Sequence, residues 1–374
     1  MQNYTIGTVW GIPIRINVSL LVFLPVLAWL IGSGAQIEAY AGLVTALAGR
    51  PVDPAALAGS RWAIGIAAAV GLFVSVALHE LGHAWTAMRY EIRVQSITLW
   101  ILGGLAALET IPKEWDRELW IALSGPAVSV LVGLACLAAT VALPASQPVA
   151  VFVVGWLAVT NLTLTVFNLL PAFPMDGGRV LRALLARSQP YATATRTAAR
   201  VGTGFAIVFA LVGVLSFSPM LLLLALFVYG AAATESRMVT TASLLEGLRV
   251  GDVAATGTTI DAAESLAALA DRMFHERRTA YAVVEGGRPL GVVTMGDLQE
   301  VDLTDYGTTT VREVATAEAP RVDRDDDAFE ALAAMGAAPV AIVVADGSAV
   351  GTLSREDYGA VMAFRRRAGD VGPF

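Results

Sequence analysis

Residues 63–88 read AIGIAAAVGLFVSVALHELGHAWTAM, an apolar run that ends in a short polar motif. A helix needs roughly 20 apolar residues to cross a bilayer, so this stretch predicts a membrane-spanning helix. Residues four apart lie on one face of a helix, and His79 and His83 have that spacing. Two imidazoles placed so can bind one metal ion, and Glu80 beside the first can reach a water on that ion. The stretch therefore predicts a metal site at membrane depth; the alternative is a pair of histidines hydrogen-bonded within a helix bundle.

A catalytic zinc site needs a third protein ligand besides two histidines. The third histidine of the chain, His275, lies in a charged run that predicts a solvated helix end. Another acidic residue in a strongly apolar context is Asp176, which follows Pro171 and Pro174 and precedes two glycines. Broken backbone of this kind is tolerated at membrane depth where it lines a polar cavity. Asp176 is therefore the predicted third ligand, and the alternative is that it only caps the next helix.

The composition predicts a membrane protein. Of 374 residues, 56% are hydrophobic and 15% are charged, with a mean hydropathy of +0.65, whereas soluble domains are about 25% charged. These values argue against a purely soluble enzyme and against a disordered chain. The last two of the apolar runs are short and are compatible with one helical hairpin. The six predicted spans are Val18–Ala35, Ala63–Met88, Leu119–Leu143, Val149–Leu170, Val201–Phe217 and Pro219–Ala233.

The loop charges predict the orientation. Basic residues follow the second, fourth and sixth spans, while the loops after the third and fifth spans carry no charge. By the positive-inside rule, both termini would face the cytoplasm in a multi-pass protein of the cell membrane. The first apolar run starts late and only Arg15 precedes it as a positive charge, which argues against a cleaved signal peptide. The segment Thr5–Val18 instead predicts a short hairpin at the membrane interface.

The charge is divided unevenly along the chain. Residues 1–245 carry 13 basic and 10 acidic side chains, and residues 246–374 carry 12 and 22, which together give the net charge of −7. The division predicts a membrane domain over 1–245 and a soluble domain over 246–374. The acidic tail argues against nucleic acid as a partner. The single cysteine, Cys136, excludes an intrachain disulfide, and we expect it to be a small buried apolar residue.

The soluble domain contains an internal repeat. The segment GVVTMGD at 291–297 recurs sixty residues later as GTLSRED at 351–357. An apolar strand precedes each copy, and an alanine-rich helix precedes each strand. The doubled order predicts a pair of α/β units over about 246–305 and 308–365. The predicted helices are Ala262–Phe274 and Asp327–Met335, and the strands after them are Tyr281–Val284 and Val340–Val344.

These motifs resemble a known family. The sequence HELGH at 79–83, followed 93 residues after His83 by Asp176 in the pattern Asn168-x-x-Pro-x-x-x-x-Asp-Gly, is similar to the site-2 proteases, which are intramembrane zinc metalloproteases. The resemblance covers nearly all of residues 1–235 and includes Gly103-Gly104 and Ser124-Gly125-Pro126. The tail resembles a tandem of cystathionine-β-synthase-type (CBS) domains. The expected fold is therefore an α-helical protein of about six spans with a C-terminal α/β tandem of CBS domains.

The resemblance implies roles for the membrane residues. His79, His83 and Asp176 would hold one Zn²⁺ per chain, Glu80 would carry the proton from water to the leaving amine, and Asn168 would donate a hydrogen bond to the oxyanion. A helix–helix hydrogen bond is the alternative for Asn168. The substrates would be transmembrane segments of membrane proteins, unwound locally in regulated intramembrane proteolysis. The segment Val94–Ala107 is a candidate strand edge for holding them, and the alternative is a re-entrant packing loop.

The resemblance also implies a regulatory tail. Adenine nucleotides such as ATP or AMP would bind between the repeats, where Thr294, Asp297, Ser354 and Asp357 match the family's contact positions. The alternative is that these side chains only cap the helices that follow them. Tandems of this kind often pair, so a homodimer is expected. The rival function is a CBS-regulated ion transporter or channel. A third option is a catalytically silent scaffold, but such a protein would have no need of Glu80.

Overall fold

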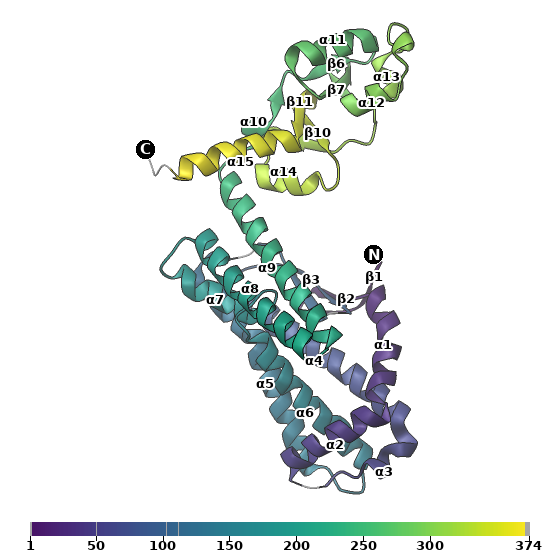
Figure 1. Cartoon of the computed structure of the whole chain (residues 1–374), viewed down its shortest axis with the longest axis vertical. Coiled ribbons are helices and arrows are strands. Elements are labelled where there is room, and N and C mark those ends of the chain that lie inside the picture. The colour runs from purple at the N-terminus through teal and green to yellow at the C-terminus, as the bar shows by residue number, and fades with distance from the viewer. Residues whose placement is uncertain (1, 50, 102, 111, 371–374) are drawn as a thin grey trace. The chain divides into compact units, whose positions relative to one another are not determined.

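A computed structural model describes residues 2–49, 51–101, 103–110 and 112–370 (Figure 1). The chain divides into two compact units, Met1–Ser236 and Arg237–Phe374. The predicted domain boundary after residue 245 falls at the end of helix α9, nine residues beyond this division.

The first unit combines a small sheet with long helices, which Figure 1 shows running side by side. In chain order its elements are β1 Asn3–Val9, β2 Ile12–Asn17, α1 Val18–Ile31, α2 Gly34–Ala48, α3 Pro54–Leu57, the 3-10 turn η1 Ala58–Ser60, α4 Arg61–Arg89, β3 Val94–Trp100, β4 Gly103–Leu108, α5 Trp115–Ala142, α6 Pro148–Asn168, α7 Asp176–Ala186, α8 Tyr191–Leu215 and α9 Pro219–Leu245.

The helices confirm the prediction of a multi-span membrane fold. Five of those in the described part are long and apolar enough to cross a membrane: α4, α5, α6, α8 and α9. The bent pair α1 and α2, with an angle of 69°, makes a sixth if it counts as one span. The last two predicted spans are separate helices of 25 and 27 residues.

The first predicted span, Val18–Ala35, is wrong at its end. Helix α1 stops at Ile31, and a second helix, α2, follows at an angle. Gly32 lies so close to the start of α4 that a Cβ there would be 2.6 Å from the Arg61 carbonyl oxygen. Ser33 then adopts an extended conformation, which separates the two helices. The sequence GSG at 32–34 thus breaks the apolar run, and Gly32 lets the backbone at the bend pack closely against α4.

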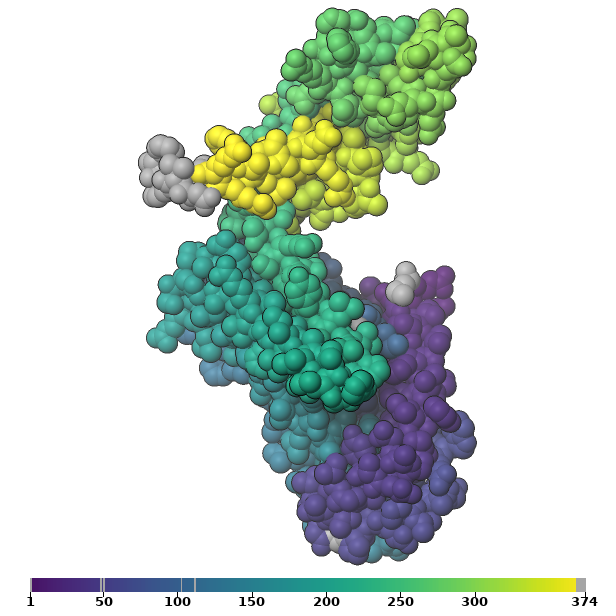
Figure 2. Space-filling view, viewed as in Figure 1, coloured from purple at the N-terminus to yellow at the C-terminus, as the bar shows by residue number. Residues whose placement is uncertain are grey.

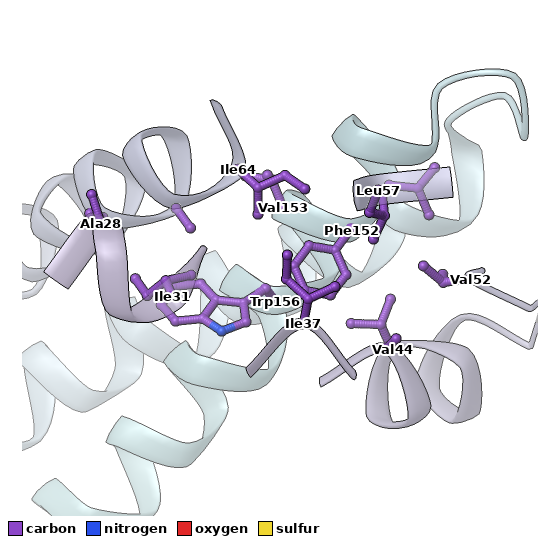
Figure 3. Close-up of a cluster of buried hydrophobic side chains, with 14 residues drawn as sticks. Ala28, Ile31, Ile37, Val44, Val52, Leu57, Ile64, Phe152, Val153 and Trp156 are labelled. Atoms are coloured by element: carbon purple, nitrogen blue, oxygen red, sulfur yellow. The ribbon is translucent and has the colours of Figure 1, made fainter. Parts of the chain in front are cut away.

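A cluster of buried apolar side chains joins the N-terminal helices to the rest of the first unit (Figure 3). Trp156 and Phe152 of α6 lie at its centre, and Ile64 of α4 packs into it. In the space-filling view α1 and α2, coloured purple, form one side of this unit (Figure 2). The other labelled members are Ala28, Ile31, Ile37, Val44, Val52, Leu57 and Val153.

The sheet of the first unit has the strand order β1-β2-β3-β4. Strands β1 and β2 form the predicted N-terminal hairpin, and Asn17 at its end caps α1 by accepting a hydrogen bond from the Ser19 amide. Strand β2 pairs in parallel with β3, and β3 pairs antiparallel with β4. The segment Val94–Ala107 is therefore a paired hairpin rather than a packing loop, and β4 lies at the outer edge of the described sheet.

The second unit carries two similar sets of strands and helices. Its elements are α10 Val250–Val253, β5 Ala255–Thr256, β6 Thr259–Asp261, α11 Leu266–Glu276, β7 Ala280–Glu285, β8 Arg288–Thr294, α12 Met295–Gln299, the 3-10 turn η2 Leu303–Asp305, α13 Val311–Val314, β9 Arg321–Asp323, α14 Ala328–Ala334, β10 Val340–Ala345, β11 Ser348–Ser354 and α15 Arg355–Asp370.

The strand pairing confirms the internal repeat. In one set β7 pairs in parallel with β6 and antiparallel with β8; in the other β10 pairs in parallel with β9 and antiparallel with β11. The registers shift at matching places, after Val283 and after Val343. Gly291 and Gly351 also match, because a Cβ at either would lie within 2.5 Å of a backbone oxygen of a neighbouring antiparallel segment. The repeat therefore extends to details of the backbone.

Candidate metal centre

Helix α4 places two imidazoles on its buried face. His79 and His83 are 7% and 5% exposed, and their Nε2 atoms lie 3.1 Å apart. The rings meet edge to face, with centroids 4.8 Å apart. The spacing of four residues thus produces the convergence that the sequence predicts.

Helix α5 fixes the orientation of both rings. The Nδ1 atom of His79 lies 2.9 Å from the Ser129 hydroxyl oxygen, and Nδ1 of His83 lies 2.7 Å from the Ile121 carbonyl oxygen. A carbonyl oxygen only accepts hydrogen bonds, so Nδ1 of His83 carries the proton. Nε2 of His83 in the neutral ring therefore presents a lone pair to the centre of the cluster.

Asp176 completes the cluster from helix α7. Its Oδ2 atom lies 3.1 Å from Nε2 of His79 and 3.3 Å from Nε2 of His83. Met175 holds the N-cap position and Asp176 is the first residue inside the helix, so capping does not account for this carboxylate. Gly177 lets the start of α7 lie against the backbone that follows α6, because a Cβ there would be 2.3 Å from the carbonyl oxygens of Leu169 and Leu170.

The three ligand atoms fit a tetrahedral cation. They lie 3.1 to 3.3 Å from one another, and zinc bound at about 2.0–2.1 Å places neighbouring ligand atoms about 3.3–3.4 Å apart. The Nε2 lone pair of His83 and the Asp176 carboxylate are both electron donors, so they repel at this distance unless a cation lies between them. The donor set and its tautomer therefore suit Zn²⁺.

Two glycines leave room around the histidine motif. A Cβ at Gly125 of α5 would lie 2.2 Å from Nε2 of His83 and 2.7 Å from Nε2 of His79. A Cβ at Gly104 of β4 would lie 2.3 Å from Cγ of Glu80. Both positions accept only glycine while the neighbouring side chains keep their places. The imidazoles thus pack directly on the α5 backbone, and Glu80 packs on the β4 backbone.

A cavity of about 370 Å³ opens onto this cluster. Glu80 is half-buried and lines the cavity, whereas the two histidines beside it are buried. Asn168, the last residue of α6, lines the same cavity. Other lining residues are Ser75, Trp100, Gly103, Gly104, Leu105, Ala106, Leu108, Ile121, Ser129, Asn161, Met175, Asp176, Arg179 and Phe227.

Several of these residues escape sequence reasoning. Ser129 was identifiable only as a small polar residue in an apolar helix, and the Ile121 carbonyl carries no side-chain signal. Asn161 donates a hydrogen bond from Nδ2 to the Ser75 hydroxyl, 3.1 Å away, one helical turn before His79. Arg179 is one turn along α7 from Asp176 and brings a positive charge to the cavity. Its sequence context suggested only a basic loop.

The four predicted nucleotide contacts sit at two equivalent helix starts in the second unit. Oδ2 of Asp297 accepts hydrogen bonds from the amide and hydroxyl of Thr294, at 2.6 and 2.7 Å. Asp357 does the same for Ser354, at 2.9 and 2.6 Å. Arg278 from the first repeat donates a hydrogen bond to Asp357, 3.4 Å away. All four side chains therefore take part in helix caps, and any nucleotide would have to share these groups with the caps.

Comparison with known proteins identifies the family. A model of peptidase family M50 matches residues 67–149 and 144–211, which contain both histidines and Asp176. Zinc metalloprotease MJ0392 of Methanocaldococcus jannaschii is 32% identical over 365 residues, covering 95% of each chain. The chain belongs to peptidase family M50, the site-2 proteases. A CBS domain model also matches residues 250–303 of this site-2 protease.

A second relative and a solved structure also resemble this site-2 protease. Rip3 of Mycobacterium tuberculosis is 32% identical over 323 residues, which cover 83% of this chain and 79% of Rip3. A solved structure of a site-2 protease from Methanocaldococcus jannaschii is 33% identical, with a TM-score of 0.44, and covers 63% of this chain and 96% of its own. Family membership confirms a zinc metalloprotease with membrane-spanning helices and favours a peptidase over an ion transporter.

Proposed function

We propose that this site-2 protease hydrolyses peptide bonds inside the transmembrane segments of other membrane proteins. The observation that carries the proposal is the convergence of His79, His83 and Asp176 at a cavity that also exposes Glu80. Helices α4 and α5, which build this cluster, are long and apolar enough to lie in a bilayer. The Glu80 carboxylate lies outside the ligand cluster but lines the same cavity, which is the position expected of a general base.

In the proposed mechanism His79, His83 and Asp176 are the metal ligands. Zinc bound there would activate a water and polarise the scissile carbonyl. The Glu80 carboxylate takes a proton from the attacking water and gives it to the amine that leaves when the C–N bond breaks. The Asn168 side-chain amide donates a hydrogen bond to the carbonyl oxygen as negative charge develops there. Ser129 and the Ile121 carbonyl hold the imidazoles in place.

Strand β4 is the proposed binding edge for the substrate. A helix hides its peptide bonds in its own hydrogen bonds, so the segment to be cut has to unwind first. Strand β4 lies at the edge of the described sheet, and its residues 103–106 line the cavity beside Glu80. An unwound segment could pair with the free edge of β4 through main-chain hydrogen bonds. Such pairing would lay its peptide bonds across the mouth of the metal centre.

The loop charges support a location in the cell membrane with both termini in the cytoplasm. Basic residues cluster after α4 and after α6, and Arg237 and Arg249 flank the end of α9, on what would be one side of the bilayer. The positive-inside rule assigns that side to the cytoplasm. The metal centre at the end of α4 would then lie nearer the cytoplasmic face, because Arg89 ends the same helix.

Removal of the metal tests the proposed function. The purified full-length chain is expected to contain about one zinc per chain, because one catalytic site with three protein ligands is present. A chelator is expected to abolish cleavage of a single-span membrane protein in liposomes, and added Zn²⁺ to restore it. Metal analysis and gel electrophoresis give both readouts. Cleavage that persists in protein shown to be free of metal would contradict the zinc assignment.

We also propose that the tail binds adenine nucleotide and thereby modulates the protease. The support is the equivalent placement of Thr294 with Asp297 and of Ser354 with Asp357, one pair in each repeat. The ion pair between Arg278 and Asp357 joins the two repeats at one of these positions. Pairing of two tails would give the proposed homodimer.

The nucleotide proposal predicts a measurable loss. Replacing Asp297 with Ala should weaken binding of ATP or AMP to the full-length chain about 10–150-fold, by removal of one charge-assisted contact worth about 1.5–3 kcal/mol. Isothermal titration calorimetry measures the dissociation constant. The matched control is Asp302→Ala, which removes the cap of the exposed turn η2. Absence of binding heat for both nucleotides in the unaltered chain would contradict the proposal.

A further inference from the structure

A buried ion pair joins α5 to α7, six residues along α7 from the ligand Asp176. The Arg182 side chain is 2% exposed and the Glu118 side chain is 0% exposed. Nε and Nη2 of Arg182 donate hydrogen bonds to Oε1 of Glu118, at 2.8 and 2.5 Å. The proposed chemistry uses neither residue, so their burial needs another reason.

The pair is costly to bury and tightly held. Taking two charges out of water is costly, so such a pair contributes little net stability, and fixing one arrangement of the chain is its better-attested role. The guanidinium carbon of Arg182 also lies 5.0 Å from the ring centroids of both Phe173 and Tyr191. These two rings and the carboxylate restrict the plane of the guanidinium. Arg182 therefore has a single well-defined position.

The two ends of the pair are connected to the metal centre through their helices. Arg182 lies six residues beyond Asp176 on α7. Glu118 lies three residues before Ile121 on α5, whose carbonyl orients His83, and the same helix carries Ser129, which orients His79. The ion pair thus joins the helix that supplies the carboxylate ligand to the helix that orients both imidazoles.

We propose that Arg182 is a positioning residue that sets the place of Asp176 relative to His79 and His83. It contacts none of the three ligands and acts through the register of α7 against α5. The inference rests on the proposed zinc ligands. It requires that a change at Arg182 alter the geometry and affinity of the metal site, and not only the stability of the fold.

A third helix shares the same guanidinium. Nη1 of Arg182 donates a hydrogen bond to Oε1 of Glu235 on α9, a side chain that is 29% exposed. Arginine can serve two carboxylates at once because its donors form a rigid planar fork, whereas a lysine ammonium is a compact point charge. Helix α9 runs on to Leu245, beyond the end of the first unit at Ser236. Through Glu235 and Arg182, α9 is therefore connected to α7, the helix that carries Asp176.

Metal binding to full-length variants in detergent tests the inference. In Arg182→Lys the dissociation constant for Zn²⁺, measured by competition with a chromogenic chelator, should rise about 10–100-fold, as for other residues that orient metal ligands. The absorption spectrum of the Co²⁺-substituted variant should also differ from that of the unaltered chain, because it reports ligand geometry. Arg196→Lys, at an exposed arginine on α8, is the matched control and should change neither readout.

Two further variants separate positioning from folding. Arg182→Met with Glu118→Leu removes both buried charges, so the fold should persist, yet zinc affinity should remain lowered. Glu235→Gln leaves the buried pair intact and should lower zinc affinity in the same direction by a smaller factor. If the folded variants bind Zn²⁺ as tightly as the unaltered chain and give the same Co²⁺ spectrum, Arg182 does not position the site. Absence of zinc binding in the unaltered chain would instead contradict the proposed function itself.

Discussion

Replacing Glu80 with Gln is expected to lower kcat/KM for a membrane-embedded substrate by about 10²–10⁴-fold, the contribution typical of a positioned general base and acid. The amide has nearly the shape of the carboxylate but cannot take the proton of the attacking water. Glu80 lies outside the cluster of His79, His83 and Asp176. The variant should therefore keep its zinc, and the loss should fall on kcat rather than on metal content.

Two comparisons sharpen the Glu80 test. Glu109→Gln, at an exposed residue just after β4, removes a nearby carboxylate that does not line the cavity and should leave the rate unchanged. An ion transporter with the same ligands would keep its flux when Glu80 is changed, because ion binding would not depend on proton transfer. A Glu80→Gln protein that still cleaves at more than a tenth of the normal rate would rule out Glu80 as the base.

Gly125→Ala is expected to disable the metal centre without touching a ligand. The added Cβ would lie 2.2 Å from Nε2 of His83 and 2.7 Å from Nε2 of His79, closer than real Cβ contacts allow. Both imidazoles are already fixed at Nδ1 by α5, so relief requires α4 and α5 to separate or the rings to turn away. We expect zinc affinity to fall by about 100-fold or more, the upper end for changes around metal ligands, and cleavage to be lost with it.

The matched control for this variant is Gly204→Ala on α8, where a Cβ would meet nothing within 4 Å. Alanine also has the higher helix propensity, so Gly204→Ala should fold and bind zinc normally. Metal analysis and circular dichroism on both variants separate loss of the site from loss of the fold. A Gly125→Ala protein with full zinc content and full activity would show that the two histidines do not pack on α5 as described.

Local pattern was enough to predict the central helix and its ligands. Apolar length and the spacing of His79 and His83 predicted α4, and one acidic residue in a broken apolar context predicted Asp176. These signals are strong because ionisable groups at membrane depth are costly and are therefore rare outside functional sites. The repeated segments at 291–297 and 351–357 likewise predicted the strands, turns and helix starts of the tail.

The residues that orient the ligands were beyond sequence reasoning. Ser129 and the Ile121 carbonyl contact the histidines because their turns of α5 face α4. No local sequence pattern predicts which turns of α5 do so. The close approach of Gly32 to the Arg61 carbonyl oxygen, at the bend after Ile31, is likewise a matter of helix packing. The local sequence around Arg182 indicates only a basic loop residue, because its partner Glu118 lies 64 residues earlier in the chain. Helix packing decides all four features.

Mapping the cut site tests the central claim most directly. A single-span membrane protein in liposomes would be incubated with the zinc-loaded full-length chain or with Glu80→Gln, and the fragments identified by mass spectrometry. Our account predicts new ends inside the apolar segment with the unaltered chain and none with the variant. Cuts confined to the water-exposed parts of the substrate, or equal cutting by both proteins, would contradict it.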